Sequence, residues 1–344
     1  MKRKKKLFGR IGPIHLIVGF VALVLMLGVY IVGWRSPVSD GVTFRVDNGA
    51  AVSAVAARLR AANLIASPDV FKAVVMIQGG KIQTGTYDIP PRASAFRIAR
   101  MMARGDVAST LVVIPEGLTI RQIKNLLLDT AALTGPVECD VADRPVCNLH
   151  DGDVFPDTYR VARGMNRLAV LELMRRKMVS IQDSWNATGG RAPAPLKTWN
   201  DVITLASIVQ KETPRASEMP IVASVYLNRL KQKMRLQADP TVVYAITGGL
   251  GDMQGRPLLR DHLKTDSPYN TYTNHGLPPA PIANVGRNAI AAVLDPADTN
   301  YLFFVADGQG GHKFSGTYAE HQKNHADWRA IKKFRNAQSK SVNR

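Results

Sequence analysis

The chain has 344 residues, of which 46% are hydrophobic and 21% are charged. These proportions are those of a globular protein, and they exclude a disordered, collagen-like or coiled-coil chain. Lys and Arg number 45 against 27 Asp and Glu, so the formal net charge of +18 indicates a polyanionic partner: nucleic acid, anionic lipid or an acidic cell-wall polymer. Because there are only two cysteines, a disulfide-built scaffold and a four-cysteine zinc site are both excluded.

The N-terminus has the pattern of a membrane anchor. Six Lys and Arg residues lie within residues 2–10, and residues 14–34 contain no Asp, Glu, Lys or Arg. An apolar helix of about 20 residues matches the ~30 Å hydrocarbon core of a bilayer. The positive charge before this segment predicts a cytoplasmic tail over 1–13, a single transmembrane helix over 14–34 and export of the rest. A cleaved signal peptide is the alternative, but residues 32–35 make a poor cleavage site and we favour the retained anchor.

The two cysteines, Cys139 and Cys147, lie close together in a polar stretch. An exported segment meets an oxidising compartment, so we expect a local disulfide in preference to two free thiols. The chain contains no CxxC redox motif. The disulfide is therefore expected to hold a loop and to take no part in chemistry.

Residues 43–114 predict a small α+β unit. In three segments apolar residues repeat at helical spacing, and Ser67-Pro68 is typical of a helix start. In chain order we expect a strand at 43–46, helices at 52–62 and from 68, a strand at 85–89, a helix at 95–102 and a strand at 111–114. This unit has no cluster of catalytic residue types, so we interpret it as an accessory or carbohydrate-binding module.

The following region, 115–335, predicts helices joined by polar loops. We expect helices at 119–128, 168–181, 201–212 and 217–230, a turn at 155–159 and a frayed helical tail after Trp328. Segments 234–244, 267–272 and 276–282 are interpreted as loops rich in Pro, Gly, Asn and aromatic residues. Such loops suit a sugar-binding groove, in which amides bind hydroxyl groups and aromatic rings cover sugar faces.

Glu212 is the strongest catalytic candidate from physical chemistry alone. It ends a strongly apolar helix, because Pro214 disfavours helical geometry in the residue before it. Both the helix dipole and the apolar surroundings disfavour a carboxylate there, so we expect its pKa to be raised. A carboxylic acid that keeps its proton near neutral pH is the general acid that glycoside cleavage needs. The alternative is a solvent-facing glutamate paired with Lys211.

Three longer strings carry a resemblance to a known family. They are LASIVQKETPRASEMPIVASVYLNRLKQKMRLQADPTVVYAI (205–246), SPYNTYTNHGLPPAPIANVGRNAI (267–290) and NYLFFVADGQGGHKFSGTYAEH (300–321). In the same order, and together with IPEGLTIRQI and FPDTYRV upstream, they resemble the MltG (YceG-like) endolytic murein transglycosylase family of the bacterial envelope. The likeness covers nearly the whole chain. It implies an α+β protein with an N-terminal transmembrane helix, a LysM-like module at 43–114 and a mixed α/β catalytic domain with a lysozyme-like helical core at 115–335.

The resemblance implies a reaction and a compartment. Members cleave the β-1,4 bond between N-acetylmuramic acid and N-acetylglucosamine without water and leave a 1,6-anhydro-muramoyl end, which terminates nascent glycan strands. The partners it implies are peptidoglycan strands and the synthases of elongation or division, with no metal, cofactor or nucleic acid. The location it implies is the plasma (inner) membrane, with the catalytic domain on the extracytoplasmic (periplasmic) side.

The resemblance also assigns roles to residues. The family's catalytic glutamate falls on Glu212, which would act first as general acid and then as general base. Many members have Glu where this chain has Gln210, so position 210 is excluded as the acid. Gln237, Asn270 and Tyr272 resemble groove residues and are expected to contact substrate.

Two further carboxylates, Glu218 and Asp239, are the candidates for a second acidic group in the substrate site. A glycosidase of the ordinary kind needs a second carboxylate about 5–5.5 Å or 6.5–9.5 Å from the first. For Glu218 the alternative role is an acid that favours the start of a helix, and for Asp239 it is a turn or a helix cap.

The sequence allows four alternatives to a lytic transglycosylase. His321 and His325 have the spacing of zinc ligands on a helix, but no HExxH motif and no third ligand accompany them. A nucleic-acid binder is suggested by the charge alone and has no supporting motif. A lysozyme-type peptidoglycan hydrolase and a non-catalytic wall-binding scaffold remain as alternatives.

Overall fold

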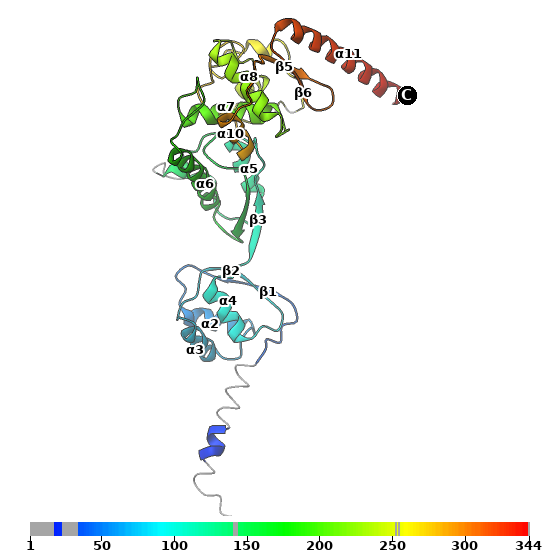
Figure 1. Ribbon diagram of the computed structural model, residues 1–344. Helices are drawn as coiled ribbons and strands as arrows, with labels where there is room; N and C mark the ends of the chain where they lie inside the picture. Colours follow the sequence, from blue (N-terminus) through cyan, green and yellow to red (C-terminus); the bar gives the residue numbers. More distant parts are fainter. Residues whose placement is uncertain (1–16, 23–33, 140–143, 252, 254, 343–344) are drawn as a thin grey trace, which may run out of the picture. The chain divides into compact units, whose positions relative to one another are not determined.

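The computed structural model describes residues 17–22, 34–139, 144–251, 253 and 255–342 (Figure 1). The tail predicted over 1–13 and most of the membrane span predicted over 14–34 lie outside these residues. Residues 17–22 are helical and their side chains are exposed. Among the described residues, no helix combines the length and the apolar character needed to cross a membrane.

The chain divides into two compact units. The first consists of Met1–Thr110 with Val161–Gly164, and the second of Leu111–Arg160 with Met165–Arg344. The division after Thr110 differs from the boundary after residue 114 that the sequence predicts, and the short segment 161–164 joins the first unit.

The first unit packs three helices around a two-stranded antiparallel sheet. On the first strand Phe44 and Val46 are buried while their neighbours are exposed, which is the alternation expected for a sheet with one covered face. Phe44 lies opposite Tyr87, and both pack with Leu59, Phe71 and other apolar side chains of the core. The elements are β1 (Val42–Val46), α2 (Val52–Ala61), α3 (Pro68–Ile77), β2 (Gly85–Ile89) and α4 (Ala95–Arg104). The predicted order of these five elements is confirmed.

The third strand predicted for this unit pairs elsewhere. β3 (Ser109–Val113) forms a separate two-stranded sheet with β4 (Thr158–Ala162). The sequence predicted a turn at 155–159, which is wrong for the last two of those residues. Only Val112 of β3 is buried, so the strand lacks the apolar face that would have joined it to β1 and β2.

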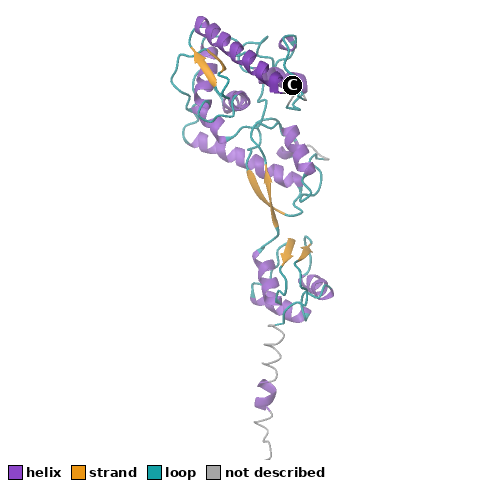
Figure 2. Ribbon diagram, turned by 90° about the vertical axis from the view of Figure 1, so that its right-hand side faces the viewer, coloured by secondary structure: helices purple, strands orange, loops and turns teal. Residues whose placement is uncertain are grey.

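The second unit is mainly helical, as the purple helices of Figure 2 show. Its core surrounds α7, in which every residue from Val202 to Val209 is buried. A helix that is apolar on all sides is one that other elements cover, and α8 and α10 pack against it. The helices of this unit are α5 (Ile120–Asp129), α6 (Arg167–Ala187), α7 (Trp199–Glu212), α8 (Met219–Lys231), α9 (Asp239–Thr247), α10 (Arg287–Leu294) and α11 (Tyr318–Val342), with short 3-10 helices at Pro145–Cys147 and His262–Lys264.

One helix corrects a predicted loop, and three further elements lie where the sequence predicted none. The segment 234–244 contains the start of α9, which begins at Asp239-Pro240 and ends at Gly248 in a left-handed conformation. Proline is well accommodated in the first turn of a helix, so Pro240 is compatible with a helix that starts at this point. The other unpredicted elements are α10 and the antiparallel hairpin of β5 (Phe303–Ala306) with β6 (His312–Ser315).

Capping side chains mark the starts of several helices. Ser67 and Thr119 cap α3 and α5, where the sequence predicts helix starts. Ser94 and Thr198 cap α4 and α7, and sequence reasoning did not select them. The predicted disulfide between Cys139 and Cys147 is confirmed.

Candidate active site

Glu212 is the last residue of α7, and the structure surrounds it with groups from other elements. Its side chain is half-buried, and the hydroxyl of Tyr226 on α8 donates a hydrogen bond to Oε2 at 3.1 Å. α7 is buried in the core from Val202 to Val209, so the packing around it fixes the position of the helix. The catalytic candidate therefore stands on a rigid element.

The pKa of Glu212 is raised from 4.5 to about 7. Loss of water on burial is the largest cause, and the nearby carboxylate of Asp239 acts in the same direction. The hydrogen bond from Tyr226 and the charges of His312 and Arg229 lower the pKa in part. The upward shift predicted from the apolar surroundings is confirmed, and a pKa near 7 suits a group that must give and then recover a proton at neutral pH.

Glu212 opens onto a cavity of about 600 Å³, a size ordinary for sites that bind small molecules. Asp239, at the start of α9, lines the same cavity, so the structure brings together two of the predicted site residues. Lys211 lines the cavity as well and donates from Nζ to the carbonyl of Gly117 at 3.3 Å, a contact with the loop before α5. Further lining comes from Thr119, Tyr244, Ile282 and the segment around Arg256.

Tyr272 joins Asp239 at the edge of this site. Its hydroxyl donates to Oδ1 of Asp239 at 2.6 Å, and it is half-buried while Asp239 is exposed. The irregular segment before α9 is joined to the loop that carries Tyr272, since the backbone N–H of Gln237 donates to the carbonyl of Thr271 at 3.1 Å. Three of the predicted substrate-binding residues, Gln237, Asp239 and Tyr272, therefore lie on one continuous surface.

Asn270 lies behind that surface. It is fully buried, its Nδ2 donates to the carbonyls of Leu263 and Thr265 at 3.0 and 2.8 Å, and its Oδ1 accepts from the backbone N–H of Tyr272 at 2.9 Å. The amide thus fixes the loop that presents Tyr272. Gln210, two residues before the end of α7, accepts from the N–H of Gly286 at 3.1 Å and so joins α7 to the start of α10.

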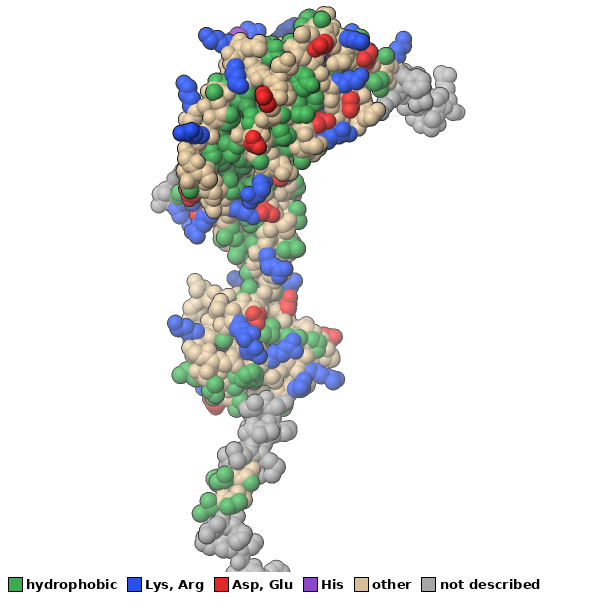
Figure 3. Space-filling model, viewed as in Figure 1, with side chains coloured by type: hydrophobic (Ala, Val, Ile, Leu, Met, Phe, Trp, Pro, Cys, Tyr) green, Lys and Arg blue, Asp and Glu red, His purple; other side chains and the backbone are tan. Residues whose placement is uncertain are grey.

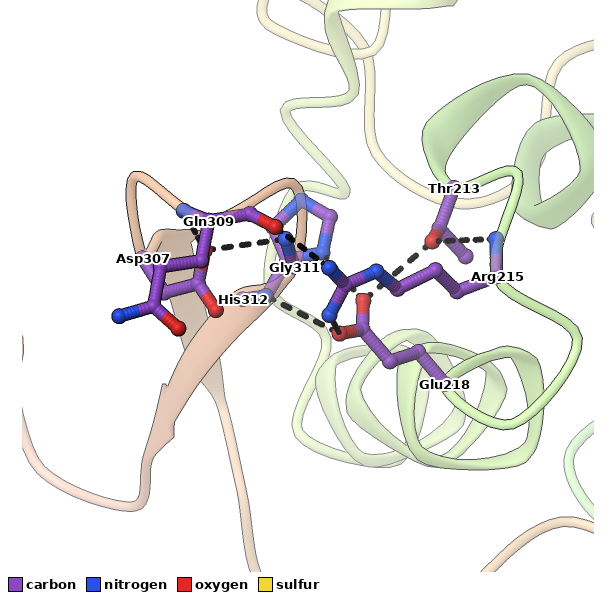
Figure 4. Close-up of polar contacts among 7 residues, drawn as sticks. All are labelled: Thr213, Arg215, Glu218, Asp307, Gln309, Gly311 and His312. Atoms are coloured by element: carbon purple, nitrogen blue, oxygen red, sulfur yellow. Dashed lines mark hydrogen bonds and ion pairs between the residues drawn. The ribbon is translucent and has the colours of Figure 1, made fainter.

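Glu218 is placed apart from the cavity. It stands at the start of α8, with its side chain 13% exposed, and its carboxylate binds His312 on β6 (Figure 4). Sequence reasoning did not select three residues whose charge or hydrogen bond acts on Glu212: Tyr226, Arg229 and His312. Tyr226 was visible as a polar-tipped aromatic in an apolar helical stripe, a type of residue that seeks a hydrogen-bond partner when buried.

The alternative zinc pair lies elsewhere. The rings of His321 and His325 are 6.1 Å apart, and His321 stacks on Phe303 at 5.1 Å. Among the residues that the structure describes, no group of three or more His, Cys, Asp or Glu side chains is arranged to hold a metal ion.

Comparison with known proteins places this chain in a family. The model of the YceG-like family matches residues 44–327, and the chain belongs to that family. A Bacillus subtilis protein named endolytic murein transglycosylase is 29% identical over 307 residues, which is 82% of this chain and 83% of that protein. A protein of the same name from Streptococcus pneumoniae is 31% identical over 178 residues, which is 51% of this chain and 31% of that protein.

A solved structure extends the similarity to the fold. The crystal structure of a yceG-like protein from Listeria monocytogenes aligns with a TM-score of 0.50 and 27% sequence identity. The alignment covers 83% of this chain and 99% of that protein. The mixed α/β architecture with small sheets is thus shared with a member of the family.

Proposed function

We propose that this chain is an endolytic lytic transglycosylase that cleaves the β-1,4 bond between N-acetylmuramic acid and N-acetylglucosamine in peptidoglycan. The observation that carries the proposal is Glu212, a carboxyl group with a pKa of about 7 that opens onto a cavity of about 600 Å³. Membership of the YceG-like family and the names of the relatives from Bacillus and Streptococcus support it.

In the proposed mechanism Glu212 is the only acid–base group. Protonated Glu212 gives its proton to the glycosidic oxygen, the bond from that oxygen to C1 breaks, and the muramoyl ring acquires oxocarbenium character. The carboxylate then takes the proton of the muramoyl C6 hydroxyl, whose oxygen bonds to C1. The proton count closes without water, and the product is a 1,6-anhydro end. A pKa close to the working pH allows both transfers by one group.

The neighbouring residues are given supporting roles. Gln237, Asp239 and Tyr272 form the surface proposed to contact the sugars, and Asn270 acts on substrate through the loop that it holds. The Lys and Arg side chains spread over both units in Figure 3 suit a glycan whose stem peptides carry carboxylates.

Location and partners belong to the same proposal. Residues 14–34 anchor the chain in the plasma membrane with residues 1–13 in the cytoplasm, and the rest faces the wall. The first unit, with its β1–α2–α3–β2 order, serves as a LysM-like glycan-binding module. Release of new glycan ends so close to the membrane suits a partner that synthesises strands for elongation or division.

Product analysis tests the reaction. The full-length protein in detergent is incubated with uncrosslinked glycan strands, and mass spectrometry reads the new muramoyl ends, with Glu212→Gln as the inactive control. Ends lighter by one water than a reducing end are expected. Reducing ends would instead make the chain a lysozyme-type hydrolase, with Asp239 as the second carboxylate in the cavity. Binding of the strands without cleavage would instead indicate a non-catalytic wall-binding scaffold.

A further inference from the structure

The carboxylate of Glu218 is the centre of a contact between the segment after Glu212 and the β5–β6 hairpin (Figure 4). Its Oε2 accepts from Thr213 Oγ1 at 3.3 Å and lies 2.8 Å from Nδ1 of His312. Its Oε1 accepts from the backbone N–H of His312 at 3.2 Å and lies 3.5 Å from Nη1 of Arg215. A side chain with this many partners and little exposure is fixed in one position.

The turn between β5 and β6 lies against that carboxylate and is held by its own hydrogen bonds. Asp307 accepts from the backbone N–H groups of Gln309 and Gly311 at 2.6 and 2.9 Å, which closes the turn, and Arg215 donates to the carbonyl of Gln309 at 2.5 Å. A Cβ atom at Gly311 would collide with the Glu218 carboxylate and the Arg215 guanidinium. A side chain at position 311 would therefore have to displace the Glu218 carboxylate from the partners that hold it.

A second path leads from the hairpin to the catalytic candidate. The ring of His312 stands edge-on to Phe304, with centroids 5.1 Å apart, and Phe304 stands edge-on to Tyr226 at 5.9 Å. Tyr226 donates the hydrogen bond to Glu212. Edge-to-face contacts of aromatic rings are directional, so the position of each ring constrains the next.

We propose that Glu218 and His312 form a positioning pair that holds Glu212 in the orientation needed for proton transfer. One connection runs through Thr213, the residue that follows Glu212 in the chain, and the other runs through Phe304 and Tyr226. The cavity that Glu212 lines is formed by other described residues, so the pair acts through its neighbours and not on the substrate. The proposal rests on the function proposed above for Glu212.

Kinetics separate positioning from binding. We expect Glu218→Gln and His312→Gln each to lower kcat between about 10-fold and about 100-fold, the cost of a small misplacement of a reacting group, while KM changes less than about twofold. Because the two residues act as one unit, the double variant should be no slower than the slower single variant within about twofold. Glu172→Gln is the matched control. Like Glu218, Glu172 is a half-buried carboxylate held by ion pairs, in its case with two arginines, and it lies on α6 away from the site.

The pH profile separates positioning from a general loss of structure. His312 lowers the pKa of Glu212, so its removal should raise that pKa and move the loss of activity at high pH to a higher pH. A loosened site would admit water, lower the pKa and move the loss of activity to a lower pH. The groups whose charge or hydrogen bond acts on Glu212 are Tyr226, Arg229, Asp239, Tyr272 and His312.

Three kinetic results would overturn the proposal: unchanged kcat in both single variants, losses that multiply in the double variant, or a rise in KM alone. A titration of the Glu212 carboxyl followed by carbon NMR tests the pair without turnover, since His312→Gln should move that titration to higher pH. If the wild-type protein cleaves nothing, the proposed function fails, but the titration still tests whether His312 acts on Glu212. An unchanged titration would refute the positioning pair.

Discussion

The carboxyl group of Glu212 is partly withdrawn from water and accepts a hydrogen bond from Tyr226. We predict that Glu212→Gln folds normally and loses more than about 100-fold in rate, because an amide of the same shape has no proton to give. Turnover of glycan strands measures the loss in rate, and a thermal unfolding curve shows whether the variant folds. A rate within about threefold of wild type would remove Glu212 from the mechanism.

The same substitution has a consequence for stability. The pKa is about 7 in the folded protein against 4.5 for an ordinary glutamate. Between these pH values the folded state holds a proton that the unfolded state has released, so the free energy of unfolding falls as pH rises through this window. Above pH 7 this effect lowers the free energy of unfolding of the wild-type protein by about 1–3 kcal/mol.

We therefore predict that Glu212→Gln is more stable than the wild-type protein at pH 8 and not at pH 4.5. Denaturant unfolding at the two pH values measures the difference. An equal gain at both values would mean that the carboxyl pKa is not its source.

The β5–β6 hairpin approaches Glu218 most closely at Gly311, where a Cβ atom would collide with the carboxylate. We predict that Gly311→Ala lowers kcat about 10-fold or more and destabilises the protein by about 1–3 kcal/mol, because the new methyl group displaces the hairpin from Glu218. Gly316→Ala is the control, since its Cβ would lie 3.4 Å from the nearest atom, the carbonyl oxygen of Asn300. If both variants behave alike, the close approach at Gly311 has no role in catalysis.

Elements with a strong local pattern were predictable. The apolar run of α7 and Pro214 placed the catalytic candidate at a helix end, and Ser67 and Thr119 marked the starts of α3 and α5. The start of α9 at Asp239 was missed because Pro and Gly residues around it resemble a loop. The hairpin was missed because each of its strands has only four residues.

The pairing of Glu218 with His312 lay beyond prediction for a different reason. The two residues are 94 positions apart, so no periodicity or spacing connects them. From the sequence, Glu218 was expected to bind substrate or to favour a helix start, and its partner was not identified. Contacts of this kind depend on how α8 and a distant hairpin pack together, which one sequence does not reveal.

For the molecule as a whole, the proposed anchor has a direct test. Deletion of residues 1–35 should move the protein from the membrane fraction to the soluble fraction, because the apolar run of residues 14–34 provides most of the membrane affinity. Fractionation followed by immunoblotting measures this. If the mature wild-type protein lacks these residues by mass, the segment is a cleaved signal peptide. If the truncated protein stays in the membrane fraction, another part of the chain binds there.

The burial of α7 has one more consequence, which concerns timing. In an unfolded chain Glu212 is surrounded by water, has an ordinary pKa and is ionised at neutral pH, so it has no proton to offer a glycosidic bond. The acid comes into being only when the core of the second unit closes around that helix. Under the proposed mechanism, a newly made chain therefore cleaves no glycan until this unit has folded.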